Sequence, residues 1–129
     1  MSETEKITIN LGVVDLGKID LLVEQGFYTT RTDFIRAGIR SQLLSHHAEI
    51  QETVTRRAIV VGVLHYSASA LEKIIARGEQ VEIIAAGMLV LSDDISPALA
   101  LAAIKSIQVF GVFKSSKEVK QALADRITD

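Results

Sequence analysis

The chain has 129 residues, with 14 basic and 16 acidic side chains and a formal net charge of −2 at pH 7. It contains no cysteine, which excludes disulfides, thiolate metal ligands and a cysteine nucleophile. The N-terminus is polar and no apolar run is long enough to cross a membrane, so we expect no signal peptide, no membrane span and a cytoplasmic location. Proteins that bind nucleic acid through bulk charge are usually basic. Any DNA contact of this chain must therefore come from a few placed residues.

Residues 6–11 alternate strictly between apolar and polar side chains, which predicts a half-buried strand. The apolar face carries Ile7, Ile9 and Leu11, and the polar face carries Lys6, Thr8 and Asn10. One short strand is not stable by itself. Its nearest available partner is the same strand of a second chain.

Two helices are predicted to follow this strand. Asp15 is placed to cap the first helix, and Gly26 supplies a left-handed residue just past its end. Thr30 and Asp33 have the spacing of a capping box, with a hydroxyl at the N-cap and a carboxylate three residues later. The apolar spacing beyond them extends the second helix to about Thr55.

The segments EKITINL and VDLGKIDLLVEQGFYTTRTDFIRAGIRSQLL resemble the ribbon-helix-helix DNA-binding family, the CopG- and Arc-like repressors, over about residues 4–47. The resemblance implies a homodimer formed by residues 1–47, whose two strands make an antiparallel ribbon that enters the major groove of double-stranded DNA. It also implies that the polar strand residues Lys6, Thr8 and Asn10 contact the bases. Their chemistry suits this role, because lysine donates to guanine, asparagine pairs with the adenine edge, and threonine serves either. An ordinary solvated strand face has the same composition.

The start of the second helix is the predicted phosphate site. Unpaired backbone N–H groups and the positive end of the helix dipole attract phosphate there. The predicted phosphate-contacting residues are Thr29, Thr30, Arg31 and Thr32. The alternative is that Thr30 and Asp33 only cap the helix.

Residues 58–129 are more apolar than the preceding part and contain an internal repeat. Three strand-like runs align on Gly62, Gly87 and Gly111, and each ends at a serine that precedes a helical pattern. This part is predicted as β-α-β-α-β-α. A short solenoid is favoured over a compact sheet covered by helices, and its uncapped ends favour association with other subunits. The fold class is thus α+β, with a ribbon-helix-helix domain at 1–47, a helical connector at 48–57 and a repeat domain for oligomerisation or regulation at 58–129.

No pattern in the sequence supports catalysis or a bound cofactor. There is no nucleophile–base constellation and no glycine-rich nucleotide-binding motif. The pair His46-His47 points in two directions on a helix, and the pair Asp93-Asp94 precedes a helix where carboxylates act as caps, so no metal site is predicted. Nickel-responsive relatives use several histidines and a cysteine, a set that this chain lacks.

We therefore predict a DNA-binding transcriptional regulator, most simply a repressor, and not an enzyme. The homodimer forms through residues 1–47, and residues 58–129 assemble a higher homo-oligomer. Two alternatives remain. One is an antitoxin that neutralises a toxin with its C-terminal segment. The other is a polymer-forming structural protein for which DNA is only an anchor.

Overall fold

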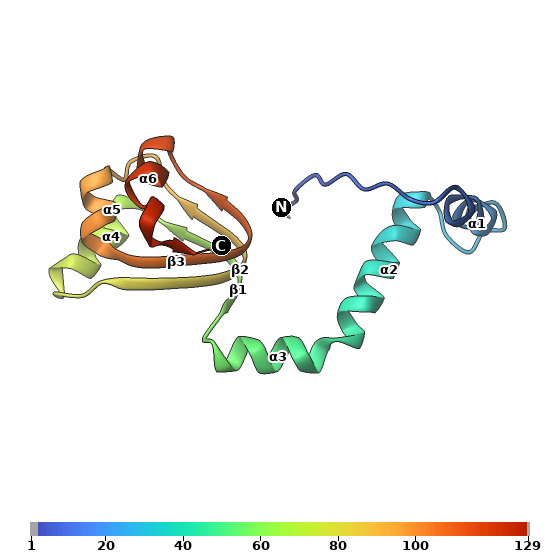
Figure 1. Ribbon diagram of the computed structural model, residues 1–129, viewed down its shortest axis with the longest axis horizontal. Coiled ribbons are helices and arrows are strands. Elements are labelled where there is room, and N and C mark those ends of the chain that lie inside the picture. The colour runs from blue at the N-terminus through green and yellow to red at the C-terminus, as the bar shows by residue number, and fades with distance from the viewer. Residues whose placement is uncertain (1–2, 129) are drawn as a thin grey trace. The chain divides into compact units, whose positions relative to one another are not determined.

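The structure is a computed structural model that describes residues 3–128 (Figure 1). Its contacts divide the chain into an N-terminal unit, residues 1–52, and a C-terminal unit, residues 53–129. The division falls inside a helix near the middle of the chain.

The N-terminal unit consists of an extended segment and helices. The helices are α1 (Val13–Glu24), α2 (Arg31–Ser45) and the first half of α3 (His47–Arg56). The extended segment, residues 3–12, is assigned neither helix nor strand. The strand predicted at 6–11 is therefore not formed in the single chain, because strand hydrogen bonds require a partner strand.

Two details of the predicted helices were wrong. The first helix begins after Gly12, which caps it without a side-chain hydrogen bond, and Asp15 lies inside the first turn instead of capping it. The second helix does not run through to Thr55. It ends at Ser45, because the backbone of the C-cap residue His46 (φ −106°, ψ 16°) leaves the helical region before α3 begins. The expected end of the first helix is confirmed, since Gly26 has a φ of +86°.

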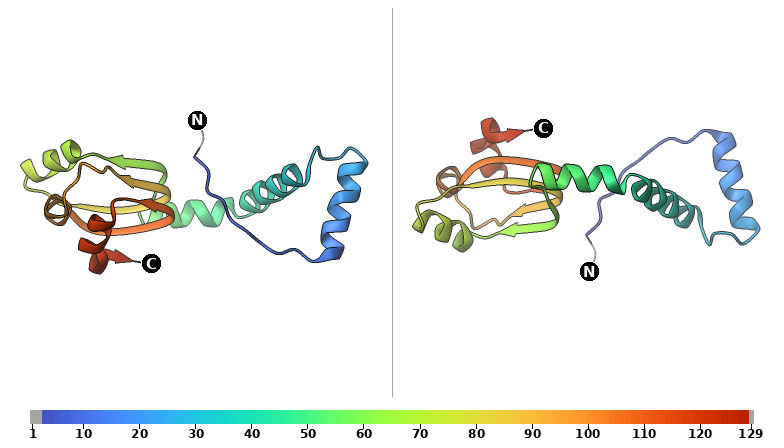
Figure 2. Two further views of the ribbon diagram at one scale, coloured as in Figure 1. Left: turned by 90° about the horizontal axis from the view of Figure 1, so that it is seen from above. Right: turned by 90° about the horizontal axis from the view of Figure 1, so that it is seen from below.

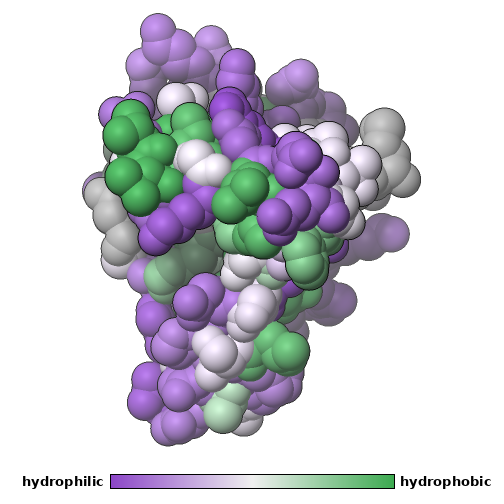
Figure 3. All heavy atoms as spheres, turned by 90° about the vertical axis from the view of Figure 1, so that its right-hand side faces the viewer, coloured by the Kyte–Doolittle hydropathy of each residue, from purple (hydrophilic) through white to green (hydrophobic). Residues whose placement is uncertain are grey.

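The N-terminal unit has almost no core of its own. Ile19 is its one buried residue among those that the structure describes. Apolar side chains interrupt the hydrophilic surface on the face where α1 lies (Figure 3). The exposed large apolar residues of this unit include Ile7, Ile9, Leu11, Val13, Val14, Leu21, Phe27, Ile39, Leu43 and Leu44. So much exposed apolar surface indicates that another chain completes the core.

The C-terminal unit alternates strands and helices. Its elements are β1 (Val60–Tyr66), α4 (Ala68–Ala76), β2 (Val81–Leu91), α5 (Pro97–Ala103), β3 (Ile104–Lys114), α6 (Lys117–Ala122), a 3₁₀ turn η1 (Ala124–Arg126) and β4 (Ile127–Thr128). The four strands form one sheet in chain order, β1-β2-β3-β4, and every pair is parallel. Such an order is consistent with the favoured solenoid, in which each turn contacts only its neighbours.

The strand pairing follows the sequence repeat. Gly62 pairs with Gly87, and Gly87 with Gly111, all with φ between +124° and +137°. The long strands turn back on themselves partway along, so that each repeat forms one bent coil closed by its helix (Figures 1 and 2). A residue with a Cβ rarely adopts this backbone conformation. In addition, a Cβ at Gly87 would meet the carbonyl oxygen of Gly62. Glycine is required there both by conformation and by the neighbouring coil.

Serine caps begin the three helices of this unit. The hydroxyls of Ser67, Ser96 and Ser116 accept hydrogen bonds from the backbone of α4, α5 and α6. The serine that ends the second strand-like run, Ser92, is not a cap and instead bonds to His65. The helix α5 ends at Ala103, because β3 begins directly at Ile104.

The core of this unit lies between the strands and α4–α6. Its buried members are Leu71, Ile83, Leu89, Leu91, Ile95, Ala100, Ala103, Ile104, Ile107, Val119 and Leu123. The alternate residues of the strands point to the opposite face, which no helix of this unit covers: the exposed side chains of Val61, Val63 and Phe110 lie there. An apolar face is unusual on an uncovered parallel sheet.

The two ends of the solenoid differ. At the β3 end, β4 pairs with Ile107 and Gln108, and the Arg126 guanidinium donates hydrogen bonds to the carbonyl oxygens of Leu101 and Ile104 at 2.6 and 2.8 Å. At the β1 end, the outer edge of the strand has no paired strand among the described residues. The chain caps one end of its solenoid and leaves the other open.

Candidate nucleic-acid interface

The predicted base-contacting residues lie in the extended segment. Lys6, Thr8 and Asn10 are all exposed. The alternating apolar residues are exposed as well, with Ile7 at 75% and Ile9 at 62%. In a single chain both faces of the segment therefore meet solvent. A second chain that paired with this segment would bury the apolar face and leave the polar face outward.

The start of α2 has the predicted N-cap at Thr30, but the reciprocal hydrogen bond to Asp33 comes from the residue before the cap. The Thr30 hydroxyl accepts a hydrogen bond from the backbone N–H of Asp33, and the Asp33 carboxylate accepts one from the backbone N–H of Thr29, both at 3.0 Å. The cap is confirmed. It also places a carboxylate at the predicted phosphate site, where its negative charge opposes an incoming phosphate.

Arg31 connects α2 to α1. Its Nε and Nη2 groups donate two hydrogen bonds of 2.7 Å to the two carboxylate oxygens of Asp20. This fork-like pair is the strong geometry for arginine and carboxylate. The hydrogen bond to Arg31 lowers the pKa of Asp20, and the same bond raises the pKa of Arg31. Arg31 thus has a structural partner that the sequence pattern did not reveal.

The four predicted phosphate-contacting residues are therefore not equivalent. Thr30 and the backbone of Thr29 are engaged in the cap, and two donor groups of Arg31 are engaged by Asp20. The Nη1 group of Arg31 and the side chain of Thr32 make no hydrogen bond in the part of the chain that the structure describes. These two groups therefore keep free hydrogen-bonding capacity at the start of α2.

A second basic feature lies farther along α2. Arg36, Ile39 and Arg40 line a hollow of about 340 Å³ together with Thr4 of the extended segment. Two guanidinium groups one helical turn apart share a face. Sequence reasoning assigned these arginines no DNA contact. Their proximity to the extended segment was visible only in three dimensions.

A smaller hollow between α1 and α2 is apolar. It has a volume of about 250 Å³ and is lined by Asp15, Lys18, Ile19, Leu22 and Phe34. The ring of Phe34 also contacts Tyr28 edge-on, with centroids 5.0 Å apart. An open apolar hollow beside the one buried residue of the unit is suited to receive an apolar side chain from a second chain.

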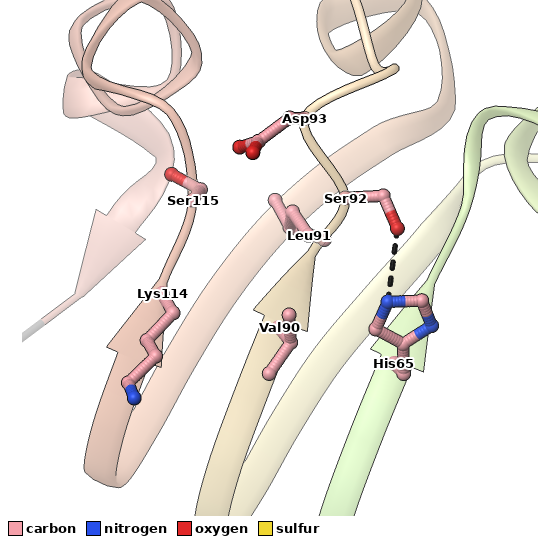
Figure 4. A pocket seen from close by; sticks show the side chains of 7 residues that line it. All are labelled: His65, Val90, Leu91, Ser92, Asp93, Lys114 and Ser115. Atoms are coloured by element: carbon pink, nitrogen blue, oxygen red, sulfur yellow. Dashed lines mark hydrogen bonds between the residues drawn. The ribbon is translucent and has the colours of Figure 1, made fainter.

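A polar hollow lies at the carboxyl ends of the strands of the C-terminal unit (Figure 4). Its volume is about 340 Å³, and its lining residues are His65, Val90, Leu91, Ser92, Asp93, Lys114 and Ser115. His65 Nε2 lies 2.9 Å from the Ser92 hydroxyl, while the Lys114 ammonium points away from Asp93 (Figure 4). Neighbouring Asp94 accepts a hydrogen bond from the backbone of Ala68 at 3.2 Å, so this carboxylate caps α4 and not the helix that follows it.

The described residues contain neither a metal-binding cluster nor a membrane-spanning helix. Across residues 3–128, no three histidine, aspartate or glutamate side chains are grouped to hold a metal ion. Within the same residues no helix has both the length and the apolar content needed to span a bilayer.

Comparison with known proteins identifies the family. A model of the ribbon-helix-helix transcriptional regulator family matches residues 2–120. The match extends well beyond the segment at 4–47 that suggested the family and includes all three glycines of the repeat. No curated protein and no solved structure matches the chain. Since the family model covers most of its length, the chain belongs to the ribbon-helix-helix transcriptional regulator family.

Proposed function

We propose that this protein is a cytoplasmic, sequence-specific repressor that binds DNA as a homodimer through residues 1–47. Two extended segments pair as an antiparallel ribbon, and Lys6, Thr8 and Asn10 read base edges in the major groove. The start of α2, from Thr29 to Thr32, binds the flanking phosphates. The observation that carries the proposal is the N-terminal unit with a single buried residue, Ile19, because such a unit needs a second chain to fold.

The C-terminal unit, in this proposal, joins chains into a higher homo-oligomer. Its support is the uncovered apolar face and the open β1 end of the solenoid. Several ribbons held together raise the effective concentration of each at an adjacent half-site. A chain with a net charge of −2 gains more from such multivalency than a basic protein does.

The folded C-terminal unit bears on the two alternatives. An antitoxin neutralising segment is typically disordered before binding, whereas residues 53–129 contain a buried core of their own. The observation favours a regulator over an antitoxin. A polymer-forming protein differs from a closed oligomer in mass, which light scattering measures: a mass that rises with concentration without a plateau would favour the polymer.

The experiment that tests the base contacts is in vitro selection of genomic fragments by the full-length protein. We expect an enriched motif with repeated half-sites. Thr8→Ala and Asn10→Ala should each lower the affinity for that motif by roughly 1–3 kcal/mol, with little effect on nonspecific DNA. Glu79→Ala, a substitution at an exposed site of the C-terminal unit, is the control. Equal loss on specific and nonspecific DNA, or loss of the dimer, would remove these residues from base reading.

A separate prediction concerns the pair of Asp20 and Arg31. Asp20→Asn removes the carboxylate that engages two donor groups of Arg31. We expect tighter DNA binding and a steeper dependence of log K on log salt, by about 1 for each Arg31 that gains a phosphate. Asp15→Asn removes the same charge from the same helix without altering Arg31. An unchanged salt slope in Asp20→Asn would show that Arg31 does not contact phosphate.

The same pair has a defined pH dependence. The pKa of Asp20 is lowered in the folded chain, so ionisation of this group favours the folded state. Its stabilising effect is fully present above the unfolded pKa of about 3.9 and is lost as the pH falls through the lowered folded value. We expect the contact between α1 and α2 to be insensitive to pH near neutrality and to weaken only in acid. Amide exchange of α1 in wild type and Asp20→Asn measures this directly.

A further inference from the structure

We infer that the open β1 edge pairs with the β1 edge of a second copy of this chain, in a twofold contact centred on Gly62. The inference rests on the proposed self-association of the C-terminal unit and specifies which surface provides it. The pairing would join two solenoids into one continuous sheet.

The residues of β1 leave its outer edge unprotected. β1 is seven residues long, and its outer edge has no paired strand within residues 3–128. Val61 is 65% exposed and Val63 is 54% exposed. Proteins usually protect long exposed edges with charged side chains, proline or a covering segment. The sequence VVGVLHY has neither proline nor a permanently charged residue.

The β3 end and the β1 end of the sheet differ in how they are covered. The β3 end is closed by β4 and by Arg126, which bonds two backbone carbonyls there. Solenoids need both ends covered. On the β1 side the chain supplies no further coil, because only residues 57–59 separate β1 from α3. The missing cover must therefore come from another molecule.

The shape of the β1 edge restricts which strand can pair with it. Gly62 has a φ of +136°, and the strands of this unit are bent coils (Figure 2). A strand that stacks on β1 must bend at the matching place. The second copy of β1 has that bend and is equally uncovered. Twofold contacts use the same surface on both molecules, so one contact would close both open ends.

The bend also fixes the register. A bent strand superimposes on its own reversed copy only when the twofold axis passes through the bend. Gly62 would then face Gly62 of the second copy, and Val61 of each chain would face Val63 of the other. A Cβ at Gly62 would meet no atom of its own chain within 4 Å. The space beside Gly62 is therefore available to a second strand.

The connection to the N-terminal unit favours a second copy over an unrelated partner. Members of this family bind DNA typically as dimers. Residues 57–59 tie each β1 to α3, so a dimer supplies two β1 strands at high effective concentration.

Cysteine pairing tests the register, because the natural chain has no cysteine. Full-length Val61→Cys and Val63→Cys chains, carrying different tags, are co-expressed and mildly oxidised. Facing residues of antiparallel strands lie about 4.5–5.5 Å apart at Cα, within the range that a disulfide spans. We expect the disulfide between the Val61→Cys and Val63→Cys chains to form about a hundredfold faster than a disulfide between two Thr128→Cys chains. Thr128 lies in β4, at the other edge of the sheet.

Each other outcome has a definite meaning. Cross-linking of Val61→Cys only to Thr128→Cys would indicate head-to-tail stacking and overturn the proposal. Preferential cross-linking through Phe110→Cys would indicate contact by the sheet face and also overturn it, as would no cross-link at all in chains whose circular dichroism matches wild type. DNA binding is measured on the same variants. Cross-linking without DNA binding would overturn the proposed function alone, and DNA binding without cross-linking would overturn this inference alone.

Discussion

Gly87→Ala is expected to unfold the C-terminal unit or to lower its free energy of unfolding by more than about 4 kcal/mol. A Cβ at this position would lie 2.1 Å from the carbonyl oxygen of Gly62, which is backbone and cannot move aside cheaply. The residue also has a φ of +137°, a conformation that alanine rarely adopts. The measurement is hydrogen exchange of the β2 amides, together with thermal unfolding followed by circular dichroism.

Gly62→Ala is the matched control for this prediction. Its φ is +136°, almost equal to that of Gly87, but a Cβ there would meet nothing within 4 Å. Within a single C-terminal unit we expect it to cost only the conformational strain, about 1–3 kcal/mol. The difference between the variants therefore isolates the steric overlap of neighbouring coils. Equal destabilisation by the two substitutions would show that the glycines do not stack as the register requires.

Ile9→Arg is expected to abolish dimerisation through the N-terminal unit, and with it DNA binding. In the proposed ribbon, Ile9 of each chain is buried by the other chain, although it is 62% exposed in one chain alone. Losing the burial of both side chains raises the dissociation constant by about a thousandfold, and burying two charges raises it further. The measurement is a DNA titration of the full chain, with amide exchange of α1 and α2 reporting the unfolding of the N-terminal unit.

Ile75→Arg provides the control for an apolar-to-charged substitution. Ile75 is exposed on α4 of the C-terminal unit, outside the proposed ribbon. This variant should bind DNA as wild type does. If Ile9→Arg retained full DNA affinity and protection of α1 and α2, residues 6–11 would not form the ribbon.

With these results, the N-terminal unit would bind DNA and the C-terminal unit would associate the chains. The N-terminal unit is completed by dimerisation, so that folding and formation of the DNA-reading surface are one event. The C-terminal unit has its own core, and in the proposed oligomer it holds the ribbons together. In this proposal a chain with a net charge of −2 binds DNA because its affinity comes from several linked contacts.

Local features of this protein were determined by the sequence itself. The capping box of Thr30 and Asp33 and the left-handed Gly26 were predictable because their physics involves residues a few positions apart. The repeat was predictable because each coil uses the same pattern, and its three glycines pair in the register that the pattern indicates.

Other features were decided only by the tertiary structure, because they join residues that no local pattern relates. Asp20 engages Arg31 from another helix, and Arg57 donates a hydrogen bond to Gln108 at 2.7 Å across 51 positions of sequence. The cap of α4 by Asp94 is of the same kind. The strand at 6–11 shows the reverse case: its alternation is encoded locally, but its hydrogen bonds need a second chain. The sequence pattern determines which face of each element is apolar. Tertiary packing determines which residues far apart in the sequence come into contact.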